Sequence, residues 1–177
     1  MQTIEILREI NLFHQLNSTE LLKVSRLCQK VAVKAGKVIF KAGDPGDALY
    51  CLHKGEVQVI KPGVKDEPEE VVYELGAGEI FGEMALFEDM PRSATIRAKS
   101  DCNLLRIPRD YFEKLINSDK DVALKIYQAL NLILTHRLRE TTERLAIANR
   151  IIRLSCQEGQ AHPNIAGDIS IKQDRKD

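Results

Sequence analysis

The sequence predicts a mainly β fold: a double-stranded β-helix, or jelly-roll-like β-roll, with flanking helices and a long dimerisation helix after it. Eight of the ten glycines fall between Gly36 and Gly82, among short runs rich in valine, isoleucine and tyrosine. Short strands with closely spaced turns are typical of a roll, barrel or sandwich. No glycine falls between Glu83 and Glu158, so this part of the chain can support long helices.

The composition is that of a soluble globular protein. A chain of 177 residues fits one domain, or one domain and a fragment. The 26 basic and 26 acidic side chains cancel, so the chain as a whole has no nucleic-acid footprint. No apolar run approaches the roughly 18 residues of a membrane span, and the N-terminus lacks the apolar core of a signal peptide. We therefore expect a cytoplasmic protein that does not enter a membrane.

The cysteines and histidines give no sign of a metal site or of catalysis. Cys28, Cys51, Cys102 and Cys156 form no CxxC pair, which argues against zinc and iron–sulfur sites. Nothing in the sequence pairs the four histidines as ligands, and no nucleophile–base pair suggests catalysis. We expect free thiols, no metal and no enzymatic activity.

The first elements are expected to be short helices within residues 4–29. Asn17 and Glu20 have the spacing of an N-cap with a capping box, and apolar residues follow at helical spacing. From Val31 to Ile107, strands are predicted at VAV, KVIF, ALYCL, EVQVI, EVVYEL, TIRA and NLLRI, with glycine-containing turns between them. The polar segment KPGVKDEPEE predicts the tip of a hairpin.

After Pro108, the segment RDYFEKLI predicts a helix, and a longer helix follows it. Residues 119–156 contain no glycine or proline, and an apolar stripe recurs at steps of three and four residues, as in a coiled coil. The stripe comprises Leu130, Leu134, Leu138, Thr141, Leu145, Ala148 and Ile152. We expect part of it to contact a second copy of the chain. The alternative is two helices, broken near Ala148 and packed within one chain.

The stretch IFGEMALFEDMPRSATIRA, residues 80–98, places a carboxylate and a guanidinium close together among apolar residues. Arg92 offers a fork of donors suited to two phosphate oxygens, whereas Glu83 accepts and suits a sugar hydroxyl. Gly82 allows close backbone approach, and EMALF can form one helical turn whose N–H groups face an anion. Ser93 and the Ala94 N–H could add donors. The alternative is a buried Glu83–Arg92 salt bridge that only closes a turn.

This stretch resembles the phosphate-binding cassette of cyclic nucleotide-binding domains, F-G-E-[LM]-A-[LI] followed by P-R-[STA]-A-[ST]-[VI]-x-A. The likeness extends to LREINLFHQLNSTELLKVSRLC and GKVIFKAGDPGDALYCLHKGEVQVI, and covers essentially the whole chain. The resemblance implies a ligand site, with the ribose at Gly82 and Glu83, the cyclic phosphate at Arg92 and Ser93, and the backbone N–H of Ala94 as a further donor. Met84 and Ala85, within the same motif, complete the cassette part of the expected site.

The segment from Arg137 to Asp177 is similar to bacterial transcription factors of the catabolite activator and fumarate–nitrate regulator family. That resemblance implies a β-roll in residues 1–118, a dimerisation helix and hinge in 119–157, and the start of a winged helix-turn-helix in 158–177, where DISIK predicts a short strand. It implies a homodimer that binds DNA through a domain absent from this chain. Because the sequence stops where the recognition motif would begin, we expect a fragment of a longer protein.

In cyclic AMP-binding members of this family, a Thr-Ser pair on the long helix reaches the adenine, one residue from each subunit. RLRETTERL resembles that segment and implies Thr141 and Thr142 in this role, with cyclic AMP favoured over cyclic GMP. A gap-free count from Phe112 instead places Arg137 and Leu138 there. A further alternative is that the threonine hydroxyls bond to their own helix.

Three other functions deserve comparison. GAGEIFG has the wrong spacing for a dinucleotide-binding loop, and no helix of useful length follows it. A stand-alone cyclic nucleotide receptor that controls a partner protein is the main rival to a transcription regulator. A family member that senses haem, redox state or a metabolite is a further alternative, against which intact Glu83, Arg92 and Ser93 argue.

Overall fold

The computed structural model describes residues 2–63, 68–86 and 90–157. The chain forms two compact units, Met1–Leu134 and Thr135–Asp177. The predicted winged helix-turn-helix segment, 158–177, lies outside the described residues, as does the predicted strand within it.

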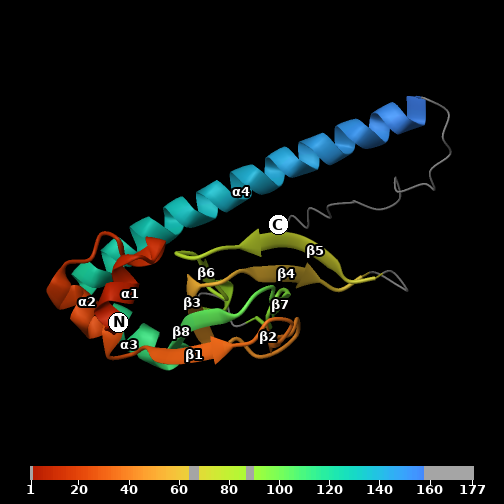
Figure 1. Ribbon diagram of the computed structural model, residues 1–177. Coiled ribbons are helices and arrows are strands. Elements are labelled where there is room, and N and C mark those ends of the chain that lie inside the picture. Colours follow the sequence, from red (N-terminus) through yellow and green to blue (C-terminus); the bar gives the residue numbers. More distant parts are fainter. Residues whose placement is uncertain (1, 64–67, 87–89, 158–177) are drawn as a thin grey trace, which may run out of the picture. The chain divides into compact units, whose positions relative to one another are not determined.

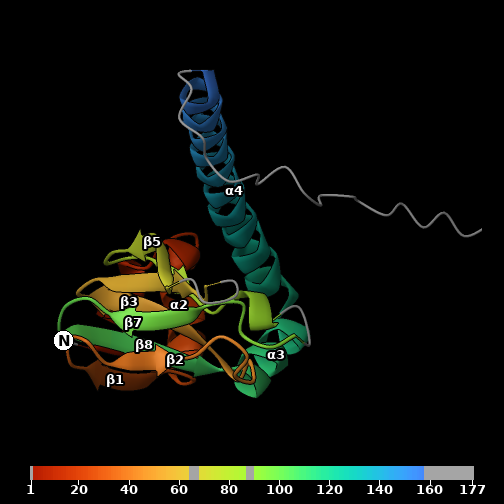
Figure 2. The ribbon, with the colours of Figure 1, turned by 90° about the vertical axis from the view of Figure 1, so that its right-hand side faces the viewer.

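The first unit contains a β-roll of two antiparallel four-stranded sheets, ordered β1-β8-β3-β6 and β2-β7-β4-β5 (Figures 1 and 2). This confirms the predicted fold class. Each predicted strand is present. The sequence did not predict β6, because this strand has only two residues. The strands are β1 (Gln29–Val33), β2 (Val38–Phe40), β3 (Ala48–Lys54), β4 (Val57–Lys61), β5 (Glu70–Leu75), β6 (Ile80–Phe81), β7 (Thr95–Ala98) and β8 (Cys102–Pro108).

Strand β3 is buried on both faces because it belongs to two cores. One set of its side chains, including Tyr50 and Leu52, faces the other sheet and forms the interior of the roll with Val57 and Ile96. Its alternate side chains, Leu49 and Cys51, face a layer of helices. Five consecutive buried residues in β3 reflect this double packing.

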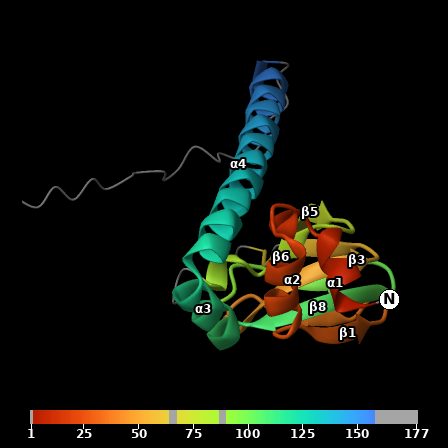
Figure 3. The same cartoon turned by 90° about the vertical axis from the view of Figure 1, so that its left-hand side faces the viewer.

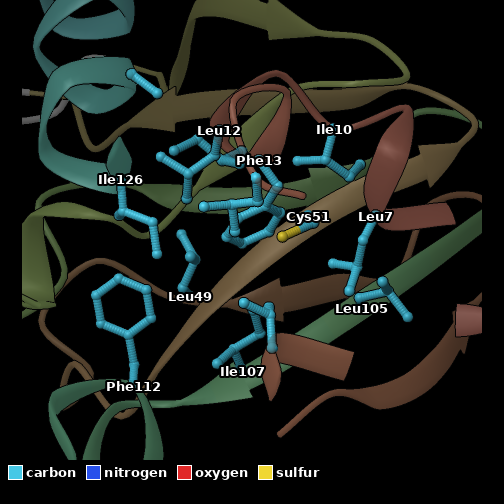
Figure 4. Close-up of a cluster of buried hydrophobic side chains, with 14 of the residues drawn as sticks. Leu7, Ile10, Leu12, Phe13, Leu49, Cys51, Leu105, Ile107, Phe112 and Ile126 are labelled. Atoms are coloured by element: carbon cyan, nitrogen blue, oxygen red, sulfur yellow. The ribbon is translucent and has the colours of Figure 1, made fainter. Parts of the chain in front are cut away.

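The helices α1 (Thr3–Arg8) and α2 (Ser18–Ser25), the 3₁₀ turn η1 (Asn11–Phe13) and helix α3 (Arg109–Ser118) lie on one side of the roll (Figure 3). Their apolar side chains form a shared core with β3 and β8 (Figure 4). The predicted capping box is confirmed, since the Glu20 N–H donates to Asn17 Oδ1 and the Asn17 N–H donates to Glu20 Oε2.

Helix α4 runs without a break from Lys120 to Gln157, so the predicted alternative of two helices broken near Ala148 is wrong. Its first turns belong to the first unit, because Val122, Ile126 and Leu130 are buried in the helical core. The two compact units therefore meet inside α4, whereas the sequence predicts a functional boundary at 118/119. Further along the helix, Leu138 and Leu145 are 68% and 61% exposed in the single chain.

Candidate functional site

A tight turn after β6 presents the glycine–glutamate pair singled out in the sequence. Gly82 has a φ of +74°, and a Cβ there would lie 2.5 Å from Arg92 Nη1 and 3.2 Å from the Ala48 carbonyl oxygen. Glu83 is buried, and the Leu86 N–H donates to its carbonyl oxygen at 2.9 Å. The predicted helical turn is confirmed as the 3₁₀ turn η2 (Met84–Leu86). Glycine is required because Arg92 occupies the space of a side chain.

Arg92 is folded into the roll, and its side chain is only 2% exposed. Nη1 donates to the Gly82 carbonyl at 3.0 Å, and Nη2 donates to the Ala48 carbonyl at 2.8 Å and to Asp47 Oδ1 at 3.0 Å. The backbone of Arg92 is fixed as well: its N–H donates to the Asp44 carbonyl, and its carbonyl accepts from the Gly43 N–H. The turn between β2 and β3 therefore holds both the backbone and the side chain of Arg92.

The guanidinium of Arg92 also lies on an aromatic cluster inside the roll. Its carbon atom is 4.2 Å from the centre of the Phe40 ring and 5.9 Å from that of Tyr50. Phe81 stacks on Tyr50 with a centroid distance of 5.2 Å and an interplanar angle of 4°. These are distances at which a guanidinium is attracted by the ring quadrupole.

Asp47 is shared by two guanidinium groups. Its Oδ1 accepts from Arg92, and its Oδ2 accepts from Arg106 Nη2, while Arg106 Nη1 donates to Gln29. Partial burial raises the pKa of Asp47, but the guanidinium groups of Arg106 and Arg92 outweigh it and hold the pKa below its ordinary value. One carboxylate thus accepts hydrogen bonds from two guanidinium groups at the same time.

Arg92 retains one donor for which the described part of the chain offers no acceptor. Its Nε is buried and makes no hydrogen bond to any described residue. A buried donor without an acceptor costs about 1–3 kcal/mol. An anionic ligand that accepts from Nε would remove that cost.

The other residues of the cassette lie before and after Arg92 in the sequence, and their side chains differ in solvent exposure. Ser93 is exposed, its hydroxyl lies 3.6 Å from Met84 Sδ, and its carbonyl accepts a hydrogen bond from Lys61 Nζ. Met84 is half exposed and Ala94 is buried. The side chain of Ala85 lies outside the described residues. Asp47 is a carboxylate partner of Arg92, in addition to any contact within the turn itself.

Thr141 and Thr142 lie in the second unit. Their hydroxyls donate to the carbonyls of Arg137 and Leu138 respectively, both at 2.8 Å. These hydrogen bonds within α4 are the alternative role that the sequence predicts for the two hydroxyls. The role of these threonines at a ligand base stays a prediction.

Asp47, Arg106 and Phe40 are not among the site residues that the sequence predicts. A signal existed for Asp47: Gly46-Asp47 precedes a buried strand, just as Gly82-Glu83 follows one. A cavity of about 600 Å³ lies beside this carboxylate, lined among others by Met90, Pro91 and Arg106.

The described residues show neither a cluster of metal-ligating side chains nor a helix that could span a membrane. They contain no group of three or more histidine, cysteine or acidic side chains that could hold a metal ion. No helix within residues 2–63, 68–86 and 90–157 is long and apolar enough to cross a membrane.

The roll, the glycine turn and the buried arginine together define a class of protein. The family model of the cyclic nucleotide-binding domain matches residues 30–119. The chain belongs to this family, and the resemblance expected from the cassette is confirmed.

Three relatives are similar over large parts of the chain. A cyclic nucleotide-binding domain from Methylobacillus flagellatus has a TM-score of 0.73 and 30% identity, covering 83% of this chain and 82% of that one. The catabolite activator protein of Thermus thermophilus has a TM-score of 0.66 and 34% identity, covering 78% and 63%. The regulatory subunit of cAMP-dependent protein kinase from Emericella nidulans is 36% identical over 116 residues, which are 66% of this chain and 27% of that protein. The chain thus matches only about a quarter of the length of this curated relative.

Proposed function

We propose that this chain is the cyclic AMP-sensing module of a ligand-gated transcription regulator. The single observation that carries the proposal is the buried Arg92, whose Nε has no acceptor among the described residues and whose partner Asp47 is shared with Arg106. A cyclic phosphate carries one negative charge and acceptor oxygens, one of which can accept from this Nε–H. The likeness to a catabolite activator protein supports the regulator class.

In this proposal the ligand spans the cassette. Arg92 Nε and Ser93 bind the phosphate oxygens, and the Ala94 N–H donates to one of them. Glu83 accepts from the ribose hydroxyl, next to the tight turn at Gly82 that holds Arg92. Met84 and Ala85 border the sugar.

The ligand is proposed to be cyclic AMP rather than cyclic GMP, because the kinase relative carries cAMP in its name. Thr141 and Thr142 of α4 are proposed to contact the base, one from each copy of a homodimer. Their hydroxyls would then exchange a bond to their own helix for one to the ligand.

The proposed mechanism is a population shift in the cytoplasm. Ligand favours one arrangement of α4 over another, and the dimer passes that choice to a DNA-binding domain outside this chain. A coupling of about 1–3 kcal/mol between the two sites would suffice for control. The chain acts as a binding module, with no catalytic step.

Isothermal calorimetry with cyclic AMP and, separately, cyclic GMP tests the proposal. We expect tighter binding of cyclic AMP, and an affinity lowered about 30-fold or more by Arg92→Ala. Arg97→Ala is the matched control, because Arg97 pairs with Glu69 at 2.9 Å on the surface of the roll. Equal affinity in wild type and Arg92→Ala, or no binding of either nucleotide, would refute the receptor assignment.

A second candidate is a cyclic nucleotide receptor that controls a partner protein instead of DNA. The similarity to a kinase regulatory subunit favours it. A gene that continues past Asp177 into a helix-turn-helix supports the regulator, and a different continuation supports the second candidate.

A further inference from the structure

We propose that Phe40 is a positioning residue for Arg92: its ring fixes the plane of the guanidinium and thereby decides which phosphate oxygen receives the Nε–H donor. This inference rests on the proposed cyclic nucleotide site. It assigns a role to a residue of β2, outside the cassette by more than 40 positions.

The contact is close and suited to this role. The guanidinium carbon lies 4.2 Å from the centre of the Phe40 ring, nearer than to Tyr50 at 5.9 Å. A guanidinium is planar and weakly hydrated, so it lies on aromatic faces more readily than an ammonium does. Since the Arg92 side chain is 2% exposed, little water competes with the ring.

The ring of Phe40 is itself held in place. Its centre lies 5.7 Å from that of Tyr50 on β3 and 6.0 Å from that of Phe81 on β6, at interplanar angles of 40° and 42°. Tyr50 and Phe81 stack on one another at 5.2 Å. Three strands therefore fix the surface on which the guanidinium lies.

The hydrogen bonds of Arg92 do not fully determine the tilt of its guanidinium plane, and the Phe40 ring limits that tilt. Gly82 and Ala48 accept from Nη1 and Nη2, together with Asp47, and thus hold one end of the planar group. All N–H donors of a guanidinium lie in its plane. With one end held and one face against Phe40, the Nε–H has a single direction in which to donate. Without the ring, the plane can tilt about its hydrogen-bonded Nη edge, and the Nε–H can reach either exocyclic oxygen of a cyclic phosphate.

The competing explanation is that Phe40 only fills space in the roll, since it also packs against the interior cluster. An aliphatic side chain of similar volume would then serve equally well. Phe40→Leu and Phe40→Met remove the ring and keep the apolar contact, whereas Phe40→Tyr keeps the ring. Using two aliphatic variants guards against one of them failing to fold.

The experiment measures the affinity of each variant for cyclic AMP and for its two diastereomeric phosphorothioates. Each phosphorothioate carries sulfur, a poor hydrogen-bond acceptor, at one of the two exocyclic positions. We expect the wild type to bind one diastereomer more tightly. The ratio of the two affinities should fall about three- to fivefold in Phe40→Leu and Phe40→Met, and be retained in Phe40→Tyr.

A filling role would lower both phosphorothioate affinities equally and leave their ratio unchanged in the aliphatic variants. That result would overturn the inference, and so would an unchanged ratio together with unchanged affinity in the aliphatic variants. The inference would also be overturned by a Phe40→Tyr variant that loses the ratio, or by a wild type that does not distinguish the diastereomers. Failure of the proposed function looks different, because then the wild type binds no cyclic nucleotide or binds it independently of Arg92.

Discussion

The Nη2 atom of Arg92 lies 3.0 Å from Oδ1 of Asp47, a residue 45 positions earlier in the chain. The pairing joins the start of β3 to the cassette before β7. Because Asp47 also accepts from Arg106 on β8, the carboxylate links three separate parts of the roll. Asp47 thereby holds the buried guanidinium of Arg92 in place.

Asp47→Asn should lower the free energy of unfolding at pH 7 by about 1 kcal/mol, a modest value because the Asp47 side chain is 58% exposed. The amide keeps the shape but removes the charge that faces both arginines. Urea denaturation measures the change. Asp101→Asn is the control, since Asp101 pairs with Lys34 at an exposed position, and it should change little. Equal losses in the two variants would contradict a special role for Asp47.

Gly82→Ala should weaken cyclic AMP binding at least tenfold, because the new Cβ would meet Arg92 Nη1 at 2.5 Å and push the guanidinium from its place. Gly36→Ala is a matched control: Gly36 has a similar φ of +78°, but a Cβ there meets nothing within 4 Å. Both variants should lose about 1 kcal/mol of stability from the left-handed backbone, and Gly82→Ala should lose more because the hydrogen bonds of Arg92 are disturbed. Only Gly82→Ala should lose affinity in calorimetry, and parallel affinity losses would contradict the argument.

The cassette could be predicted from the sequence because its residues are close together along the chain. Gly82, Glu83, Arg92 and Ser93 can be read as one motif with a defined spacing. Asp47 and Phe40 could not be placed in the same way, because their contacts with Arg92 depend on how β2 and β3 pair with β7 and β8. Strand order is a non-local property, and turn residues and periodicity do not determine it.

The long helix shows a second limit. Its length follows from the absence of glycine and proline, and the structure confirms it. Where the first compact unit ends could not be predicted, since a helix gives no local sign of which turns are buried by other elements. Val122, Ile126 and Leu130 are covered by the N-terminal helices and β strands of the core.

An ion pair between α2 and α4 should contribute to the stability of that core. Glu20, which is buried, accepts from Lys125 Nζ at 2.8 and 2.9 Å. Lys125→Met should lower the free energy of unfolding at pH 7 by about 1–2 kcal/mol. Lys34→Met, which breaks an exposed pair, is the control and should have little effect.

The same pair predicts a pH dependence. The Lys125 ammonium, and then the Asn17 N–H, hold the pKa of Glu20 below its ordinary value. A carboxyl whose pKa is lowered by folding adds stability above its unfolded pKa, about 4.3, and loses it as the pH falls through the folded pKa. The difference between wild type and Lys125→Met should therefore shrink below about pH 4 in denaturation curves. A difference that stays constant from pH 7 to pH 3 would show that the ion pair is not its source.

The apolar stripe of α4 predicts a homodimer that one charge can disrupt. Leu138 lies on the stripe, and its side chain is 68% exposed in the single chain. In a dimer, a second copy would cover this side chain. Leu138→Glu should raise the dimer dissociation constant at least 30-fold, because the dimer would bury a carboxylate without a partner. Sedimentation equilibrium measures the constant. Ile147→Glu is the matched control: Ile147 is 60% exposed but lies off the stripe, so the same change of charge should leave the dimer intact. If both variants dissociate alike, or the wild type is a monomer at high concentration, the stripe is not a dimer seam.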